Sequence, residues 1–541
     1  MRKRKGLVWS IMLTLVLSLV LAGCGGSDET SGEGDKVKDA GSGDSPEQTL
    51  IFGRGGDSVA LDPITVTDGE SFKVTKNVFD TLIDYGDQDT EIQPALAEEW
   101  DASEDGLTYT LKLREGVKFH DGTDFNADAV VYNFDRWMNG TKDKFYYYAS
   151  MFGGFKGDEG HVIKEVKAVD DYTVEFTLKR PQAPFLKNLA MSPFGIASPD
   201  AIEKQGDKFA ENPVGTGPFV FKEWKRNDRI VLEKNEEYWM EGYPKLDSVI
   251  FKSIPDNSAR LNALKTGEVD IADGVNPTDV AQIESDSNLQ VFKRPSMNVG
   301  YLGLTSNREP LNNKKVRQAL NHAVDKQAII DAFYAGQAEP AKNPMPPVIA
   351  GYNDDVEAYP YDLDKAKQLL EEAGYADGFE MELWAMPVPR PYMPDGQKVA
   401  EVIQASFEKI GVKAEIKSYE WATYLEKARN GEADSFLLGW TGDNGDADNF
   451  LYVLLDKDNI GSNNYTYYEN DELHDILIEA QSTVDEAKRE ELYKKAQEII
   501  HEDAPWIPLV HSTPALGGKA NIKNFFPHPT GSDKLTKVVF E

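Results

Sequence analysis

Strands and helices alternate between residues 364 and 449, and this order constrains the fold more than any other feature of the sequence. Three segments have the short apolar or alternating pattern of strands: 381–385, 412–416 and 435–440. Amphipathic segments with helical spacing precede or separate them: 364–373, 399–410 and 421–428. Gly374, Gly411 and Gly431 follow these helices, where glycine commonly ends a helix. Strand–helix–strand order of this kind predicts a parallel sheet with right-handed crossovers.

The chain before residue 300 has a different pattern, in which apolar and polar residues alternate over short runs. Such runs are typical of half-buried strands and occupy 107–114, 172–179, and 219–224 paired with 230–233 as a hairpin. A helix is predicted at 127–138 behind Asn126 as its N-cap, and 316–333 is largely helical. A chain of 541 residues exceeds the size at which single cores usually stop growing, about 250–300 residues. We therefore predict an α/β protein with more than one folded unit.

Composition excludes several classes of partner and site. The formal net charge is −34, from 58 Lys and Arg against 92 Asp and Glu. Nucleic acid binding depends on Lys and Arg clustered at phosphates, so this charge argues against it. The same charge disfavours an anionic membrane surface as the partner of the folded part. The single cysteine excludes an internal disulfide and any zinc or iron–sulfur site built from several cysteines.

The first residues predict an export signal. Residues 2–5 are basic, and the uncharged run 7–23 is at the short limit of length for a membrane span. This pattern predicts that residues 1–23 are a signal peptide. The only cysteine, Cys24, follows Leu-Ala-Gly. This motif resembles the lipobox of bacterial lipoproteins, in which the cysteine carries lipid that includes palmitate. There are two alternatives to a lipoprotein signal. The segment could be a simple secretory signal followed by an incidental cysteine, or it could be an uncleaved membrane anchor. Residues 24–48 are Gly, Ser and acids, and we expect a flexible linker.

Two distinctive loops follow the carboxyl ends of predicted strands, where ligands of open α/β sheets bind. One loop carries Arg390 among prolines that stiffen it, and the other carries Asp443. Arg suits a carboxylate because its planar fork donates two parallel hydrogen bonds, and Asp can accept from an ammonium. The pair would fit a ligand charged at both ends. The alternative is that both are solvated surface residues. Three tryptophans near these strands also allow two interpretations, because each could line a pocket or belong to the core: Trp384, Trp421 and Trp440.

Several segments carry a resemblance to a known family: 95–100, 104–109, 119–122, 212–219, 315–320, 351–356, 384–392 and 439–446. Through them nearly the whole mature chain resembles family 5 of the bacterial extracellular solute-binding proteins, in particular its dipeptide-binding members. The resemblance implies a two-lobed periplasmic-binding-protein-like fold of type II, α/β with mixed sheets and an extra N-terminal subdomain. It also implies that Arg390 binds the α-carboxylate of a peptide and Asp443 its α-ammonium, with Tyr392, Gly439 and Trp440 at the same ligand.

The family pattern also sets the expected domains and the points of departure. Lobe I is expected at 49–296 plus 508–541, with an inserted subdomain at about 80–210, and lobe II at 297–507. Ala447 stands where the pattern has proline, and segment 53–58 differs enough to leave the lobe I contacts open. The disulfide cysteines of Gram-negative relatives are missing, which favours a Gram-positive cell.

The predicted function is capture of dipeptides or short oligopeptides between two lobes and delivery to the permease of an ABC importer. We expect a monomer held at the outer face of the cell membrane by its lipid alone, with no cofactor, no metal, no nucleic acid and no catalytic residues. The alternatives are the same fold with another cargo (glutathione, a longer peptide, haem or a nickel chelate), a secreted hydrolase, and a chaperone-like surface protein. Run 443–448 lacks the spacing of a calcium loop. We interpret Asp84, Asp87, Asp89 and Glu91 as a solvated acidic loop.

Overall fold

The computed structural model describes residues 48–541, which form one compact unit by their internal contacts. The predicted signal peptide 1–23, the lipidation site Cys24 and nearly all of the linker 24–48 lie outside the described residues. Within 48–541, no helix is both long and apolar enough to span a bilayer.

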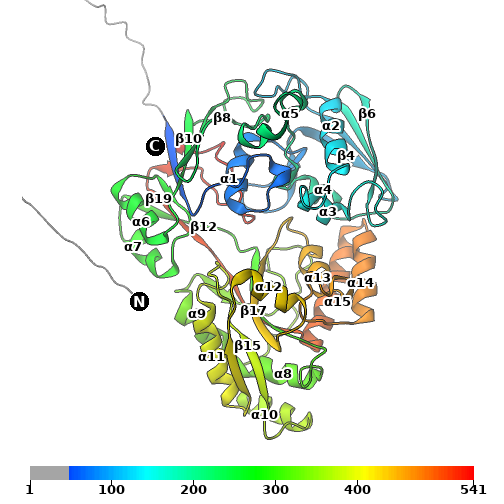
Figure 1. Cartoon of the computed structure of the whole chain (residues 1–541), viewed down its shortest axis with the longest axis vertical. Helices are drawn as coiled ribbons and strands as arrows, with labels where there is room; N and C mark the ends of the chain where they lie inside the picture. The colour runs from blue at the N-terminus through cyan, green and yellow to red at the C-terminus, as the bar shows by residue number, and fades with distance from the viewer. Residues whose placement is uncertain (1–47) are drawn as a thin grey trace, which may run out of the picture. The chain divides into compact units, whose positions relative to one another are not determined.

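The first lobe is built on a seven-stranded mixed sheet (Figure 1). Its strands, in spatial order, are β12 (Leu289–Lys293), β19 (Ala515–Lys519), β11 (Ile271–Ala272), β1 (Thr49–Arg54), β10 (Ser248–Ser253), β9 (Arg229–Lys234) and β8 (Phe219–Lys225). The predicted hairpin is β8–β9, and β1 pairs with β10 in parallel. The helices of this part are α1 (Gly69–Val78), α5 (Pro199–Gln205), α6 (Asn257–Thr266) and α7 (Val280–Glu284). Two small antiparallel sheets of two strands complete it: β2 (Ile83–Tyr85) with β3 (Ile92–Pro94), and β20 (Ile522–Lys523) with β21 (Val539–Phe540).

A subdomain with its own antiparallel sheet is inserted in this lobe. The strands are β4 (Ala97–Ala102), β5 (Thr108–Leu113), β7 (Thr173–Leu178) and β6 (Ile163–Asp170), in that spatial order. The helices are α2 (Ala127–Met138), α3 (Tyr146–Phe152) and α4 (Phe185–Leu189). The alternation seen in the sequence is the burial pattern of β5 and β7, whose inward residues join one core with Phe134 and Trp137 of α2. Asn126 caps α2 as predicted, because its side chain accepts from the backbone N of Ala129.

The second lobe contains the predicted parallel strands within a six-stranded sheet. The order is β14 (Ala338–Pro340), β18 (Trp506–Ser512), β13 (Asn298–Leu304), β17 (Ser435–Thr441), β15 (Glu380–Trp384) and β16 (Lys413–Lys417). Strand β15 runs parallel to β16 and β17, whereas β13 is antiparallel to β17 and β18. The sheet is therefore mixed, as the resemblance implied, and only its β15–β17 half has the crossover topology expected from sequence.

Helices cover both faces of this second sheet, so it is the middle of three layers. One core includes side chains from α8 (Lys314–Ala323), α9 (Lys326–Phe333), α10 (Leu363–Glu372) and α11 (Gly396–Glu408). The opposite core includes α12 (Trp421–Arg429), α13 (Asp448–Leu455), α14 (Asp471–Ser482) and α15 (Glu486–Asp503). Residues 316–333 form two helices rather than one, because Asp325 caps a new helix by accepting from the backbone N of Ala328.

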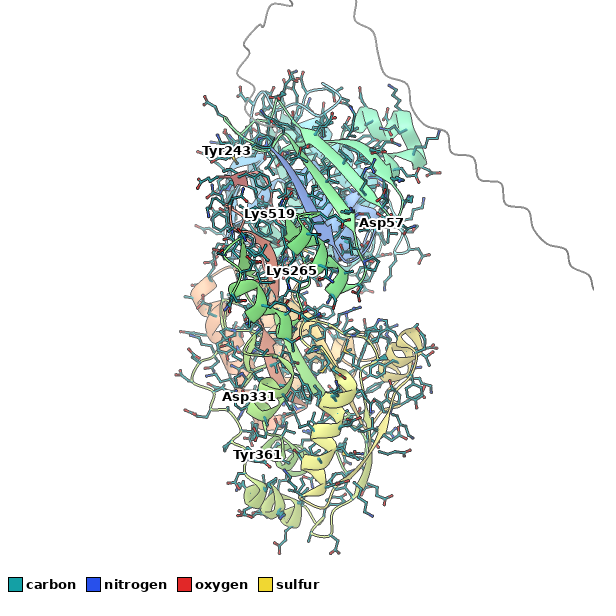
Figure 2. All side chains as sticks on the ribbon, turned by 90° about the vertical axis from the view of Figure 1, so that its left-hand side faces the viewer. Asp57, Tyr243, Lys265, Asp331, Tyr361 and Lys519 are labelled. Atoms are coloured by element: carbon teal, nitrogen blue, oxygen red, sulfur yellow. The ribbon has the colours of Figure 1, made fainter. Side chains whose placement is uncertain are left out.

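The chain passes between the two large sheets twice. It leaves the first sheet after Lys293 and enters the second at Asn298, and it returns between Ser512 and Ala515. Figure 2 shows Lys265 and Lys519 on one side of these connections and Asp331 and Tyr361 on the other. The predicted return at 507 falls inside β18, because that strand stays buried as far as Ser512. The two-lobed α/β fold is confirmed, whereas the lobe boundaries stay a prediction.

Candidate ligand-binding site

Asp443 lies in the loop between β17 and α13 and is half-buried. Its Oδ1 accepts a hydrogen bond from the Tyr147 hydroxyl at 3.2 Å, and its Oδ2 accepts from Asn449 Nδ2 at 3.1 Å. Both partners are neutral, and among the described residues no Lys or Arg forms an ion pair with this carboxylate. Burial therefore raises the pKa of Asp443 to about 6, and the two hydrogen bonds only partly oppose this rise.

The Asp443 carboxylate borders a cavity of about 160 Å³ between the lobes. The first lobe contributes Phe72, Tyr85, Tyr147 and Met191, and the second contributes the segment 441–443. Asp443 is the one charged residue among the described residues that line this cavity. A lone carboxylate in a neutral, partly aromatic cavity is an unfavourable arrangement without a cation, so the cavity favours a ligand with a positively charged group.

Arg390 lies in an exposed loop after β15 and is not among the residues that line this cavity. Its backbone pairs with Met393 through two hydrogen bonds of 3.0 and 2.9 Å, which form a tight turn. The guanidinium lies 6.0 Å from the centre of the Trp421 ring, and Nη1 donates to the Pro389 carbonyl at 3.2 Å. The structure therefore brings Asp443 into a cavity and leaves Arg390 accessible, without joining them.

Tyr392 and Gly439 lie against each other. Gly439 of β17 pairs across the sheet with Gly300 of β13. A Cβ on Gly439 would collide with the Tyr392 ring, and a Cβ on Gly300 would collide with the Tyr392 carbonyl. The Tyr334 hydroxyl donates to the same carbonyl at 2.8 Å. The two glycines and Tyr334 thus fix the turn that carries Arg390 against the sheet.

The three tryptophans have different surroundings. Trp384 is 1% exposed and belongs to the core, so it cannot line a cleft. Trp440 is half-buried and its Nε1 donates to Asn449 Oδ1 at 2.9 Å, while the same oxygen accepts from the Asp443 backbone N at 3.0 Å. Trp440 therefore positions the asparagine that in turn holds Asp443. Trp421 is half-buried beside Arg390.

Three groups that contribute to the site were not predicted: Tyr147, Asn449, and the bridging residues between the lobes. Asn444 Nδ2 donates to Asn188 Oδ1 at 2.8 Å, and Lys187 Nζ donates to the Gly445 carbonyl at 3.1 Å. Figure 1 shows α3 and α4 of the subdomain next to α13 of the second lobe. The run of three tyrosines at 146–148 was the available signal, but sequence spacing does not show which lobe they face.

A buried ion pair supports the Asp443 loop from behind. Arg489 of α15 donates to both carboxylate oxygens of Asp446, at 2.8 and 2.6 Å. Asp446 is 2% exposed. Burial alone would raise the pKa of Asp446, but Arg489 outweighs it and lowers that pKa. Paired, two-pronged charges of this kind fix geometry, so the loop is held in one conformation with Asp443 at the cavity.

Comparisons with known proteins agree with this architecture. Residues 91–462 match the model of bacterial extracellular solute-binding proteins, family 5 (middle part). The dipeptide-binding protein of Escherichia coli is 41% identical over 512 residues, which cover 91% of this chain and 95% of the relative. Haem-binding protein A of Haemophilus influenzae is 39% identical over 97% of this chain and 98% of its own length.

A solved structure gives the same result. The periplasmic binding protein DppA of Helicobacter pylori, in complex with the peptide STSA, is 39% identical with a TM-score of 0.76 and covers 91% of this chain and 98% of its own. Sequence and fold agree. This chain therefore belongs to family 5 of the bacterial extracellular solute-binding proteins.

Proposed function

We propose that this chain is the substrate-binding protein of an ABC importer that captures dipeptides or short oligopeptides and delivers them to the permease. The observation that carries the proposal is the lone, half-buried Asp443 carboxylate at the cavity between the lobes. A free peptide amino terminus supplies the missing cation, and the accessible Arg390 supplies a two-pronged partner for the carboxylate.

The space between the lobes includes the Asp443 cavity of about 160 Å³ and a larger cavity of about 580 Å³ that both lobes line. About 160 Å³ is below the range of about 300–1,000 Å³ common for drug-sized ligands. One relative is named for haem and others for dipeptides, so family membership alone does not fix the cargo. The lone Asp443 carboxylate favours a cargo with an ammonium group, which a peptide has and haem lacks. No step of capture requires a catalytic group, a cofactor or a metal.

The proposed location is the outer face of the cell membrane. The Leu-Ala-Gly-Cys24 motif supports lipidation of Cys24, and the polar residues 25–48 would let the folded part reach solutes. We expect Cys24→Ser to release the protein into the medium or to leave it as an unprocessed precursor. A variant that is still processed and still partitions into detergent would contradict the lipid anchor.

The two charged anchors can be tested with blocked peptides. We expect Asp443→Ala to weaken binding of a free dipeptide by about 2–5 kcal/mol, or roughly 30- to 5,000-fold, because it removes one partner of a desolvated charge pair. The loss should nearly vanish when the peptide is N-acetylated, since its ammonium is already absent. Arg390→Ala should show the same non-additivity with the C-terminal amide. Calorimetry on each two-by-two cycle measures the coupling.

Asp354→Ala is the matched control, because the Asp354 side chain is 91% exposed in the same lobe. It should change affinity by less than about 1 kcal/mol with every peptide. Fully additive losses from blocking a terminus and from mutating its assigned partner would show that these residues are not the anchors.

A further inference from the structure

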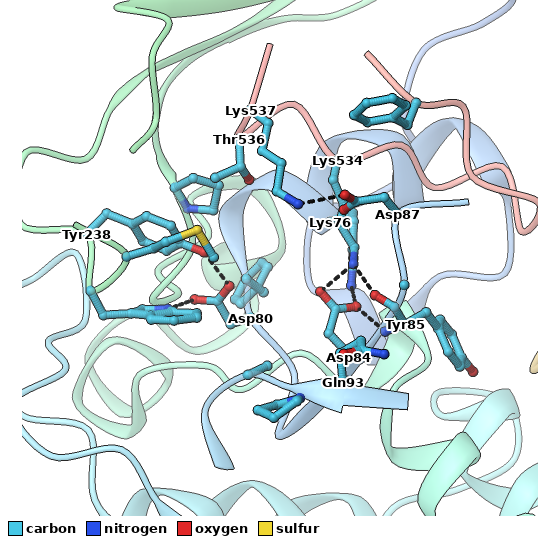
Figure 3. Close-up of a pocket in the computed structure, with 18 of the residues that line it drawn as sticks. Lys76, Asp80, Asp84, Tyr85, Asp87, Gln93, Tyr238, Lys534, Thr536 and Lys537 are labelled. Atoms are coloured by element: carbon cyan, nitrogen blue, oxygen red, sulfur yellow. Dashed lines mark hydrogen bonds and ion pairs between the residues drawn. The ribbon is translucent and has the colours of Figure 1, made fainter. Parts of the chain in front are cut away.

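A second cavity, of about 320 Å³, lies inside the first lobe and shares one lining residue, Tyr85, with the cavity of Asp443 (Figure 3). Its walls are the end of α1, the β2–β3 hairpin, the segment 238–240 and the C-terminal segment 524–537. The described residues that line it all come from the first lobe, so occupancy does not require the lobes to meet. Its volume falls within the range of small-molecule sites.

One side of this cavity has an excess of positive charge. Lys76 Nζ lies 2.6 Å from Asp84 Oδ1, and Lys534 Nζ lies 2.9 Å from Asp84 Oδ2. Figure 3 shows the Lys76 and Lys534 side chains converging on the Asp84 carboxylate. Burial lowers the pKa of Lys534, and the nearby Lys76 lowers it further, although Asp84 opposes both. Two cations with one carboxylate can accept another anion.

The prediction of a solvated acidic loop is therefore wrong for Asp84, whereas the Asp87 side chain is 38% exposed. Asp84 forms this bridge, and Asp87 Oδ2 pairs with Lys537 Nζ at 2.6 Å. The lysines that pair with them come from α1 and the last residues of the chain, which sequence proximity does not reveal. Asp89 and Glu91 are exposed, as predicted.

The other side of the cavity has an unpaired negative charge. Asp80 accepts hydrogen bonds from the Tyr238 hydroxyl at 3.1 Å, Trp239 Nε1 at 3.0 Å and Thr216 Oγ1 at 2.9 Å. All three donors are neutral, and in the described part of the chain no Lys or Arg nitrogen forms an ion pair with Asp80. Burial raises the pKa of this carboxylate. A cation placed beside it would relieve that cost.

We propose that this cavity is a second ligand site for a small zwitterion of the free α-amino-acid class. Its carboxylate faces Lys76 and Lys534, and its ammonium faces Asp80. A simple anion would be repelled by Asp80 and a simple cation by the two lysines, so a molecule with both charges fits best. Apolar walls lie between the charged sides for the side chain: Phe79, Met240, Pro94, Pro218 and Phe526. The observations that support this site are separate from those that support the function proposed for the cleft.

The test uses the purified, full-length mature protein with its cleft saturated by the dipeptide alanyl-alanine. Thermal shift with each standard amino acid identifies a binder, and calorimetry measures its affinity and stoichiometry. We expect one amino acid bound per protein, with no competition from the dipeptide. The N-acetyl and amide forms of the same amino acid should each bind at least about tenfold more weakly. Absence of binding by every amino acid at millimolar concentration, or full competition by the dipeptide, overturns the proposal.

Variants then locate the site. Lys534→Met should weaken amino-acid binding at least about tenfold and leave dipeptide binding measurable. Lys222→Met is the matched control, since Lys222 is an exposed, ion-paired lysine of the same lobe, and it should bind like wild type. If Lys534→Met does not fold, Thr536→Trp decides, because it fills the cavity without removing a charge. Unchanged affinity in Thr536→Trp overturns the proposal.

Discussion

At the scale of single residues, the proposed role of Asp443 predicts that ligand capture depends on pH. Its pKa of about 6 in the unliganded protein means that the carboxylate is protonated below that pH and must lose the proton to bind an ammonium. A peptide amino terminus stays charged at these pH values. We therefore expect dipeptide affinity to be constant above about pH 7 and to fall by about tenfold per unit below about pH 6, measured by calorimetry.

The control for this prediction is Asp443→Asn, which keeps the size of the side chain and removes its titration. Its weaker binding should show no step near pH 6. Proton release by the wild type, seen as a dependence of binding heat on buffer ionisation enthalpy near pH 6, should vanish in the variant. A step that persists in Asp443→Asn would assign the titration to another group.

At the scale of elements, strands β13 and β17 support the Arg390 turn through a pair of glycines. Gly439→Ala adds one uncharged methyl group. This group should push the Tyr392 ring away and so misplace the turn. We expect weaker binding of a free dipeptide, and little further effect on its C-terminal amide, since the amide does not use Arg390. Calorimetry with both ligands measures this selectivity.

Gly303→Ala, in the neighbouring strand β13, serves as the matched control. Its added Cβ would meet the Phe436 ring rather than Tyr392. It should therefore lower the free energy of unfolding through overpacking, by about 1–3 kcal/mol, and affect both peptides alike. Equal behaviour of the two variants in the binding assay would contradict a specific role for Gly439.

Local patterns predicted the elements well because short-range physics determines them. Strands β5 and β15, helix α2 and its cap Asn126 followed from periodicity and capping alone. The partners of Asp443 did not, because Tyr147 lies nearly 300 positions earlier and reaches it only when two lobes meet. The sequence indicated Asp443 as a candidate because it follows a predicted strand, and Arg390 because of the residues around it. The lysines that pair with Asp84 and Asp87 had no local signal at all.

At the scale of the whole molecule, contacts between the lobes predict that peptide binding and closure are coupled. Asn188–Asn444 and Tyr147–Asp443 join the subdomain to the second lobe, next to the cavity. A ligand that contacts both lobes shifts the population toward the closed form. Small-angle scattering should therefore show a smaller radius of gyration after a dipeptide is added. A dipeptide blocked at both ends should have no such effect, and unchanged scattering with a peptide proven to bind would contradict a two-lobe clamp.

Tyr85 gives this molecule a point at which two kinds of nutrient could influence one another. It lines the cavity between the lobes and also the cavity inside the first lobe. Its carbonyl accepts from Lys534, and its hydroxyl donates at 2.7 Å to the carbonyl of Lys187, the residue that bonds the Asp443 loop. Thermodynamic linkage is reciprocal. If a small ligand that repositions Tyr85 changes the affinity for peptide by some factor, then peptide changes the affinity for that small ligand by the same factor. The supply of free amino acids outside the cell would then set how tightly peptides are held, which is feedback at the moment of capture, before any transport has occurred.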